Sequence, residues 1–261
     1  MYLVSNHLQT VTRQKLHLLE QEWNIILPPS YIQFLEQYGQ GTYCGLLNVE
    51  YPDRERLREF AEYELWEHDE QSPITREQLA ECIVIATTID GDFVAVYPGV
   101  ESLIWLPRHS EIIERRSCGD QSWVECMEQW IEAAYGPRDL AETERYFEPW
   151  NNRQQHLFLM LDTQKAISNG PSVGTEDAES GSTVNNLADI ARECTAVMKP
   201  DLIIDNAYSG LHFFRQFNGY VRFNYAYGRE VAVFYEKEES QEGNGSFLVR
   251  LLQFMREHDI Q

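Results

Sequence analysis

The sequence is short of basic residues, with 21 Lys and Arg against 42 Asp and Glu and a formal net charge of −21. Proteins bind a nucleic-acid backbone largely through Lys and Arg, so this balance argues against a nucleic-acid-binding protein. It also argues against docking on an anionic membrane. The imbalance is greatest in residues 1–150, which hold 27 acidic and 11 basic residues. Such a surface is either simply well solvated or suited to a basic partner.

Cysteine pairs and long apolar runs are also missing. The cysteines are odd in number and form no CxxC pair: Cys44, Cys82, Cys118, Cys126 and Cys194. We therefore expect no disulfide framework but reduced, mostly buried thiols. The start of the chain has no signal-peptide pattern, and no apolar run reaches the ~18 residues of a membrane span. These absences predict a cytoplasmic protein.

The motifs of common enzymes and metal sites are absent. There is no GxSxG, no GxxxxGK[ST], no GxGxxG after a strand and no HExxH. Residues 90–92, Asp-Gly-Asp, begin like a calcium loop but lack the later carboxylate, which favours a simple turn. We predict no catalytic residues, no cofactor and no metal. An enzyme that uses Asp201, Asp205 and His212 is the less favoured alternative.

Residues 1–150 predict an α+β domain with helices flanking a mainly antiparallel sheet. Helices are expected over 11–23, from the prolines at 28–29 to Gly39, and over 120–136, where Trp123, Met127, Trp130 and Ile131 share a face. A hairpin is expected to turn at 90–92, and a strand to follow it.

Residues 151–261 predict a second, smaller α+β domain of unknown type. Two helices, a strand near 156–161 and a clear hairpin over 220–238 are expected. In that hairpin Val221, Phe223, Tyr225 and Tyr227 alternate onto one face. The stretch 168–183 is rich in Gly, Ser and acids, so we expect a mobile loop there.

The feature that goes beyond packing is the acidic stretch 50–70. Its segment 53–70 reads as a strongly acidic helix with Leu57, Phe60 and Tyr63 turned inward. Two interpretations stay open: a solvated helix face, or a negative patch that meets a basic protein and speeds encounter. The second interpretation assigns partner binding to Glu50, Asp53, Glu59, Glu62, Glu64, Glu67, Asp69 and Glu70.

The stretch "LPPSYIQFLEQYGQG", residues 27–41, resembles the entry motif of the SUKH superfamily: a Leu-Pro, a Tyr, a Phe-Leu and a glycine-rich stop. "IATTIDGDFVAVYPG" is similar to the family's strand–Gly-Asp–strand hairpin, while "SLIWLPR" and "SWVECMEQWI" resemble the strand and closing helix that follow. The chain departs at Gln40, where a second glycine is common. In order, these motifs cover about residues 10–135. The matching residues are Leu27, Pro28, Tyr31, Phe34, Leu35, Gly39, Gly41, Gly91 and Asp92.

The SUKH superfamily includes fungal regulators of cell-wall synthesis and bacterial immunity proteins that bind and neutralise a toxin, often a nuclease or deaminase. The resemblance implies a non-catalytic protein-binding fold. Together with the acidic composition, it leads us to expect an immunity protein whose partner is a basic toxin domain. A regulatory scaffold of the fungal kind is the alternative.

Overall fold

The protein is an α+β chain that forms two compact units. A computed structural model describes residues 1–137, 144–162, 186–237 and 244–261. The first unit comprises Met1–Leu3 and His7–Asn151, and the second comprises Val4–Asn6 and Asn152–Gln261. The sequence-based boundary lay after residue 150. The loop expected at 168–183 lies outside the described residues.

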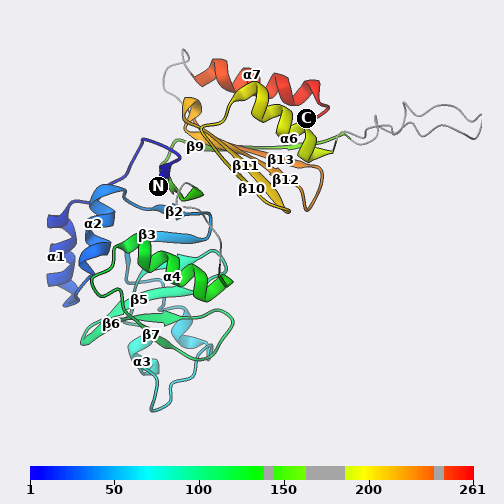
Figure 1. The fold of residues 1–261 in the computed structure, drawn as a ribbon. Coiled ribbons are helices and arrows are strands. Elements are labelled where there is room, and N and C mark those ends of the chain that lie inside the picture. The colour runs from blue at the N-terminus through cyan, green and yellow to red at the C-terminus, as the bar shows by residue number, and fades with distance from the viewer. Residues whose placement is uncertain (138–143, 163–185, 238–243) are drawn as a thin grey trace, which may run out of the picture. The chain divides into compact units, whose positions relative to one another are not determined.

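The first unit is built on a sheet with the strand order β1-β8-β2-β3-β4-β5-β6-β7 (Figure 1). Neighbouring strands pair antiparallel except β1 and β8, which are parallel. All six side chains of β4 are buried, so this central strand has both faces covered. The strands are β1 (Tyr2–Leu3), β2 (Gly41–Tyr43), β3 (Leu47–Asp53), β4 (Ile83–Thr88), β5 (Phe93–Tyr97), β6 (Val100–Leu106), β7 (Glu114–Arg116) and β8 (Tyr146–Pro149).

Two short helices, α1 (Arg13–Trp23) and α2 (Pro29–Gln37), occupy the positions that the sequence predicts. The Thr12 side chain caps α1 by accepting a hydrogen bond from the Lys15 N–H, and a proline opens α2. The buried side chains of α2 are Tyr31, Ile32, Phe34 and Leu35. Gly39 follows α2 with φ of +75°, the left-handed conformation expected there.

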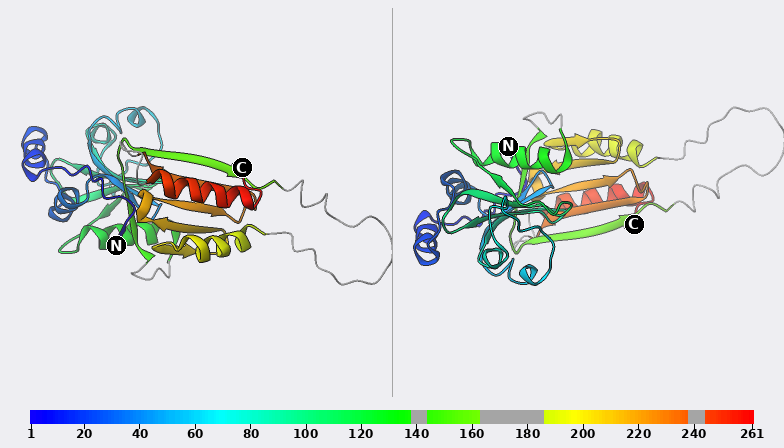
Figure 2. Two further views of the ribbon diagram at one scale, coloured as in Figure 1. Left: turned by 90° about the horizontal axis from the view of Figure 1, so that it is seen from above. Right: turned by 90° about the horizontal axis from the view of Figure 1, so that it is seen from below.

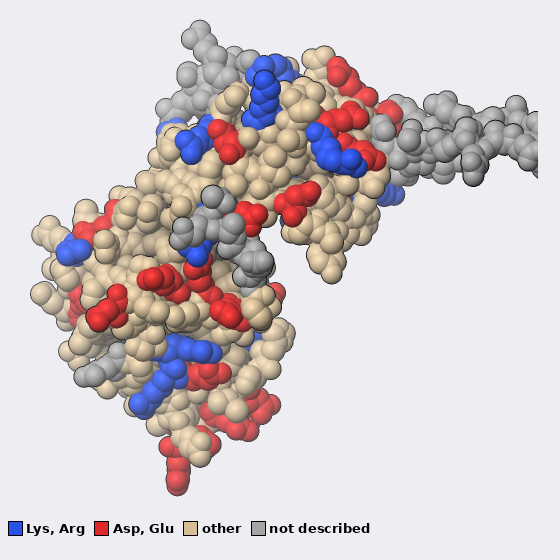
Figure 3. Space-filling model, viewed as in Figure 1, with Lys and Arg blue, Asp and Glu red and all other residues tan. Residues whose placement is uncertain are grey.

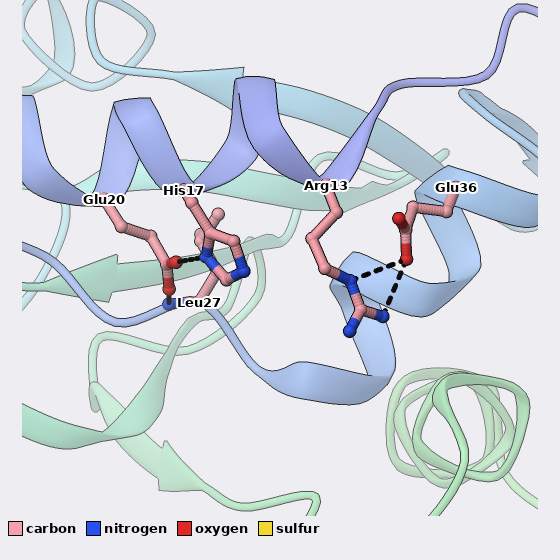
Figure 4. Close-up of polar contacts among 5 residues, drawn as sticks. All are labelled: Arg13, His17, Glu20, Leu27 and Glu36. Carbon is pink, nitrogen blue, oxygen red and sulfur yellow. Dashed lines mark hydrogen bonds and ion pairs between the residues drawn. The ribbon is translucent and has the colours of Figure 1, made fainter.

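Polar contacts fasten α1 to α2 and to the turn between them (Figure 4). The Arg13 guanidinium donates to Glu36 Oε2 from Nε at 3.0 Å and from Nη2 at 2.7 Å. Glu20 Oε1 accepts the Leu27 N–H at 2.8 Å, and its other oxygen lies 2.6 Å from His17 Nδ1. The sequence motif at 27–41 is therefore held from α1.

Helix α4 (Trp123–Tyr135) begins with a reciprocal capping box. Ser122 Oγ accepts the Glu125 N–H, and the Glu125 carboxylate accepts the Ser122 N–H. Its inner face holds the four apolar residues predicted for it, and all are buried. Trp123 packs on Tyr31 of α2 with ring centroids 4.9 Å apart.

The structure corrects the expectation of reduced thiols for one pair of cysteines. Cys118 and Cys126 are joined in a disulfide, with Cα atoms 5.5 Å apart. The turn that precedes α4 folds back, with the Gln121 N–H donating to the Cys118 carbonyl at 2.9 Å, and brings Cys118 beside the inner face of the helix. The sequence spacing of the two cysteines does not reveal that Cys118 lies beside Cys126 in the folded chain. Cys82 and Cys194 are buried thiols, as expected.

The second unit is an antiparallel sheet with the strand order β10-β11-β12-β13-β9. Helices α6 (Leu187–Met198) and α7 (Asn244–Glu257) cover one of its faces (Figures 1 and 2). Val221 and Phe223 lie in the core between sheet and helices, whereas Tyr227 is 58% exposed in a turn. The expected alternation is therefore wrong for Tyr227, because β12 ends at Asn224. The strands are β9 (Gln154–Met160), β10 (Leu202–Asp205), β11 (Ser209–Phe214), β12 (Gly219–Asn224) and β13 (Glu230–Glu236).

Candidate functional site

The acidic segment 53–70 is not the helix that its sequence suggested. It runs mostly as turns, with a single 3-10 turn, η1 (Phe60–Glu62), followed by the short helix α3 (Arg76–Leu79). The Asp53 carboxylate accepts the N–H groups of Glu55 and Arg56 and so forms a turn directly after β3. The closely spaced carboxylates also repel one another on a helix surface, which weakens the helical alternative.

Apolar side chains anchor the segment to the sheet instead. Leu57 is fully buried, and Phe60 packs edge-on against Phe93 of β5 with ring centroids 5.2 Å apart. Trp66 is 7% exposed, and its indole N–H donates to the Pro107 carbonyl at 2.8 Å. This anchoring fixes the segment without regular secondary structure and leaves its charged residues outside. The inward-facing Tyr63 of the sequence prediction is 64% exposed and is therefore a second correction.

Most of the predicted partner-binding carboxylates lie on the surface of the first unit. Figure 3 shows many acidic side chains over this unit, with a smaller group of Lys and Arg among them. Glu64 is paired with Arg76 at 3.0 Å, and Asp69 caps the N–H groups of Gln71 and Ser72. Asp53 is half-buried, and the exposed members of the set are Glu59, Glu62, Glu64, Glu67, Asp69 and Glu70.

Glu50 is the exception, and its place in the predicted patch is corrected. It lies on β3 with 8% of its surface exposed, and its carboxylate accepts the Thr87 hydroxyl from the neighbouring strand β4. Its backbone carbonyl accepts the Tyr31 hydroxyl of α2. Glu50 therefore joins strand and helix inside the unit and presents no charge to a partner.

A cleft of about 730 Å³ opens beside the acidic segment. Asp53 and Glu59 line one wall, and the turn between β4 and β5 supplies Ile89 and Asp90. A smaller hollow of about 430 Å³ adjoins it, lined by Arg58, Glu59, Phe60, Glu62 and Tyr63. The remaining predicted carboxylates, Glu64, Glu67, Asp69 and Glu70, line neither. The cleft is also lined by Asn48, Glu55, Arg56, Phe60, Leu65, Trp66, Thr87, Thr88, Gly91, Phe93, Pro107 and Arg108.

Hydrogen bonds of the Asp92 side chain hold the turn at 90–92. Asp92 is 6% exposed, and its two carboxylate oxygens accept the Thr88 hydroxyl at 2.6 Å and the Arg108 N–H at 2.7 Å. Gly91 takes φ of +99°. Asp92 thus ties the turn to the end of β6, which agrees with turn chemistry rather than a calcium loop. Asp90, by contrast, is exposed, and it neighbours the Tyr135 hydroxyl, whose pKa is raised chiefly by burial.

Residues 10–118 match the model of the SMI1 / KNR4 family (SUKH-1). The match lies within the first unit and agrees with the SUKH resemblance of its sequence motifs. The cleft, its acidic wall and the turn at 90–92 all fall within the matched residues. No curated protein and no solved structure matches the chain.

The SUKH match ends just before α4, although the sequence motifs extended the resemblance to about residue 135. Helix α4 still packs on α2 through Trp123 and Tyr31, so it belongs to the core of the first unit. The second unit lies outside the matched residues, and its fold is described by its own topology alone.

The alternative catalytic set in the second unit does not come together as one group. The Asp201 carboxylate accepts the Arg215 N–H at 2.7 Å at the start of β10, while Asp205 ends that strand and neighbours Tyr225 and His212. His212 is 2% exposed, and burial lowers its pKa to about 4.

Two cysteine thiols, Cys82 and Cys194, are deeply buried. Burial raises the pKa of Cys82 and of Cys194 to about 12, so neither thiol is a ready nucleophile. Within residues 1–137, 144–162, 186–237 and 244–261, no three His, Cys, Asp or Glu side chains are grouped to hold a metal ion. Over the same residues, no helix combines the length and apolar character that a membrane span needs.

Proposed function

We propose that this protein is a non-catalytic binding protein of the immunity type, which neutralises a cognate bacterial toxin. The toxin would be a basic protein domain, of nuclease or deaminase type. The SUKH domain would cover the toxin with the exposed carboxylates of the acidic segment and the cleft beside them. A cytoplasmic location is part of the proposal.

The observation that carries this proposal is the way the acidic segment is held. Leu57, Phe60 and Trp66 fix it to the sheet, so its carboxylates are displayed on a firm support rather than on a frayed helix. A pre-organised surface loses less conformational freedom on binding. Charges arranged in this way speed encounter with a basic protein and disfavour acidic ones.

A growth assay tests the proposal directly. Candidate toxin domains, sought first among the proteins encoded by neighbouring genes, would be expressed from an inducible promoter, with and without the present chain. We expect the chain to restore growth and to form a stable complex with the purified toxin domain. Continued cell death at equal expression, together with no complex by size-exclusion chromatography, would rule the proposal out.

A regulatory scaffold of the fungal cell-wall-regulator kind is the second candidate, favoured by the SMI1 / KNR4 match itself. It predicts the same type of protein-binding surface with a different partner. The two functions separate in the growth assay, because a scaffold would bind without protecting cells from any toxin. An enzyme whose site lies in the second unit is the least supported function, since Asp201 does not join Asp205 and His212.

A further inference from the structure

The cleft of the SUKH domain combines apolar and acidic surface in a way that suits one kind of side chain. Ile89 and Leu65 line it with 54% and 37% of their surfaces exposed. The partly buried Phe60 of the acidic segment, which packs on the core of the sheet, lines it as well. Exposed apolar side chains gathered at one concave site indicate a binding surface more often than scattered ones do. The cleft therefore offers contacts for an aliphatic or planar group, and not for charge alone.

The charges that line the cleft are mostly negative. Four carboxylates stand against two guanidinium groups, those of Arg56 and Arg108. Glu55 is paired with Arg58, and Asp53 is occupied by the backbone of its turn. Glu59 and Asp90 are exposed, and among the described residues neither carboxylate has a Lys or Arg nitrogen within the 4.0 Å of an ion pair.

We propose that this cleft receives an arginine side chain of the partner protein. The stem and flat guanidinium of arginine would pack on Phe60, Leu65 and Ile89, and its N–H groups would donate to Glu59 and Asp90. Arginine carries five donors in a planar fork and is more weakly hydrated than lysine, so it is better suited to a partly apolar site. The identity of the partner as a protein rests on the proposed function.

A small probe tests the site without the partner. N-acetyl-L-arginine amide is titrated into the isotope-labelled protein, and the signals of the Trp66 indole N–H and of the Ile89 and Gly91 amides are followed by NMR. We expect saturable shifts confined to the cleft, with a dissociation constant of about 1 mM, the scale for a ligand of this size. N-acetyl-citrulline amide has nearly the same shape but no charge, and we expect it to bind at least ~5-fold more weakly.

Matched variants assign the interaction to the two carboxylates. The double variant Glu59→Gln with Asp90→Asn should weaken binding of the arginine probe by ~5-fold or more. The control Glu67→Gln with Glu70→Gln removes the same charge from exposed positions that do not line the cleft, and it should leave binding unchanged.

The outcomes separate this inference from the proposed function. Equal binding of arginine and citrulline probes, equal loss in both double variants, or shifts that never saturate would overturn the arginine site. If the probe fails while the toxin domain still binds, the proposed function stands without the site. If the probe binds as expected and no toxin is neutralised, the site stands and the proposed function fails.

Discussion

His212 is a buried base that receives little compensation for its burial. It lies on β11 under the helices of the second unit, with its ring 5.0 Å from that of Phe223 and its Nδ1 atom without a hydrogen-bond partner in the described structure. Burial lowers the pKa of His212 from 6.5 to about 4, and nearby Asp205 offsets this only in part. The folded protein therefore keeps this imidazole neutral where an unfolded chain would protonate it.

This difference predicts an acid-sensitive second unit. Between pH 6.5 and pH 4 the unfolded state binds the proton and the folded state does not, so stability falls as the pH falls through that window. From pH 7 to pH 5 the loss due to His212 is about 2 kcal/mol. His212→Gln should remove this part of the pH dependence. All six tryptophans lie in the first unit, so hydrogen exchange at β12 amides is the suitable measurement. An unchanged slope in the variant would contradict the assignment.

Elements fixed by local sequence signals could be predicted from the sequence, whereas elements fixed by contacts between distant residues could not. Helix α4 could be predicted because Ser122 caps it and its apolar residues repeat at helical spacing. The segment 53–70 could not, because what fixes it is the Trp66 indole bonded to the Pro107 carbonyl, 41 residues away. The cleft could not be predicted for the same reason: Ile89, Asp90 and Phe60 come to line one cleft only when the chain is folded. The acidic composition of that wall was nevertheless visible in the sequence.

The end of α2 shows why the SUKH motif carries a glycine at residue 39. Gly39 takes φ of +75°, and a Cβ there would lie 2.3 Å from the backbone oxygen of Gln9. Gly39→Ala combines left-handed strain with a backbone clash and should lower the free energy of unfolding by about 2–4 kcal/mol. Gly99→Ala is the matched control, since its φ is +81° but no atom lies within 4 Å. It should cost about 1 kcal/mol. Urea unfolding followed by tryptophan fluorescence reports both, and equal losses would refute the clash.

The whole molecule carries a formal net charge of −21, and these charges could attract a basic partner either over a long distance or only at the interface. A highly charged protein attracts a basic partner through its overall field, wherever the charges lie. At physiological salt, however, the Debye length is about 8 Å, so charges at the interface dominate over distant ones. Attraction by the overall charge and attraction by a local patch therefore predict different changes in the association rate when the same number of charges is reversed at two different places.

Two triple variants distinguish these responses. Glu62→Lys, Glu67→Lys and Glu70→Lys change exposed carboxylates of the acidic segment that have no hydrogen bond or ion pair in the described structure. Glu22→Lys, Asp120→Lys and Glu132→Lys change exposed carboxylates on and around α1 and α4. Because each reversal adds two charges, both proteins move from −21 to −15.

The association rate with the basic toxin domain, measured by stopped flow from low to physiological salt, gives the answer. If the acidic segment meets the partner, its triple variant should associate about 10-fold more slowly at low salt and show a shallower salt dependence. The control variant should lose less than ~3-fold, because its charges act only through the screened field. Equal losses in the two variants would mean that net charge alone steers the encounter and that the segment is a solvated surface.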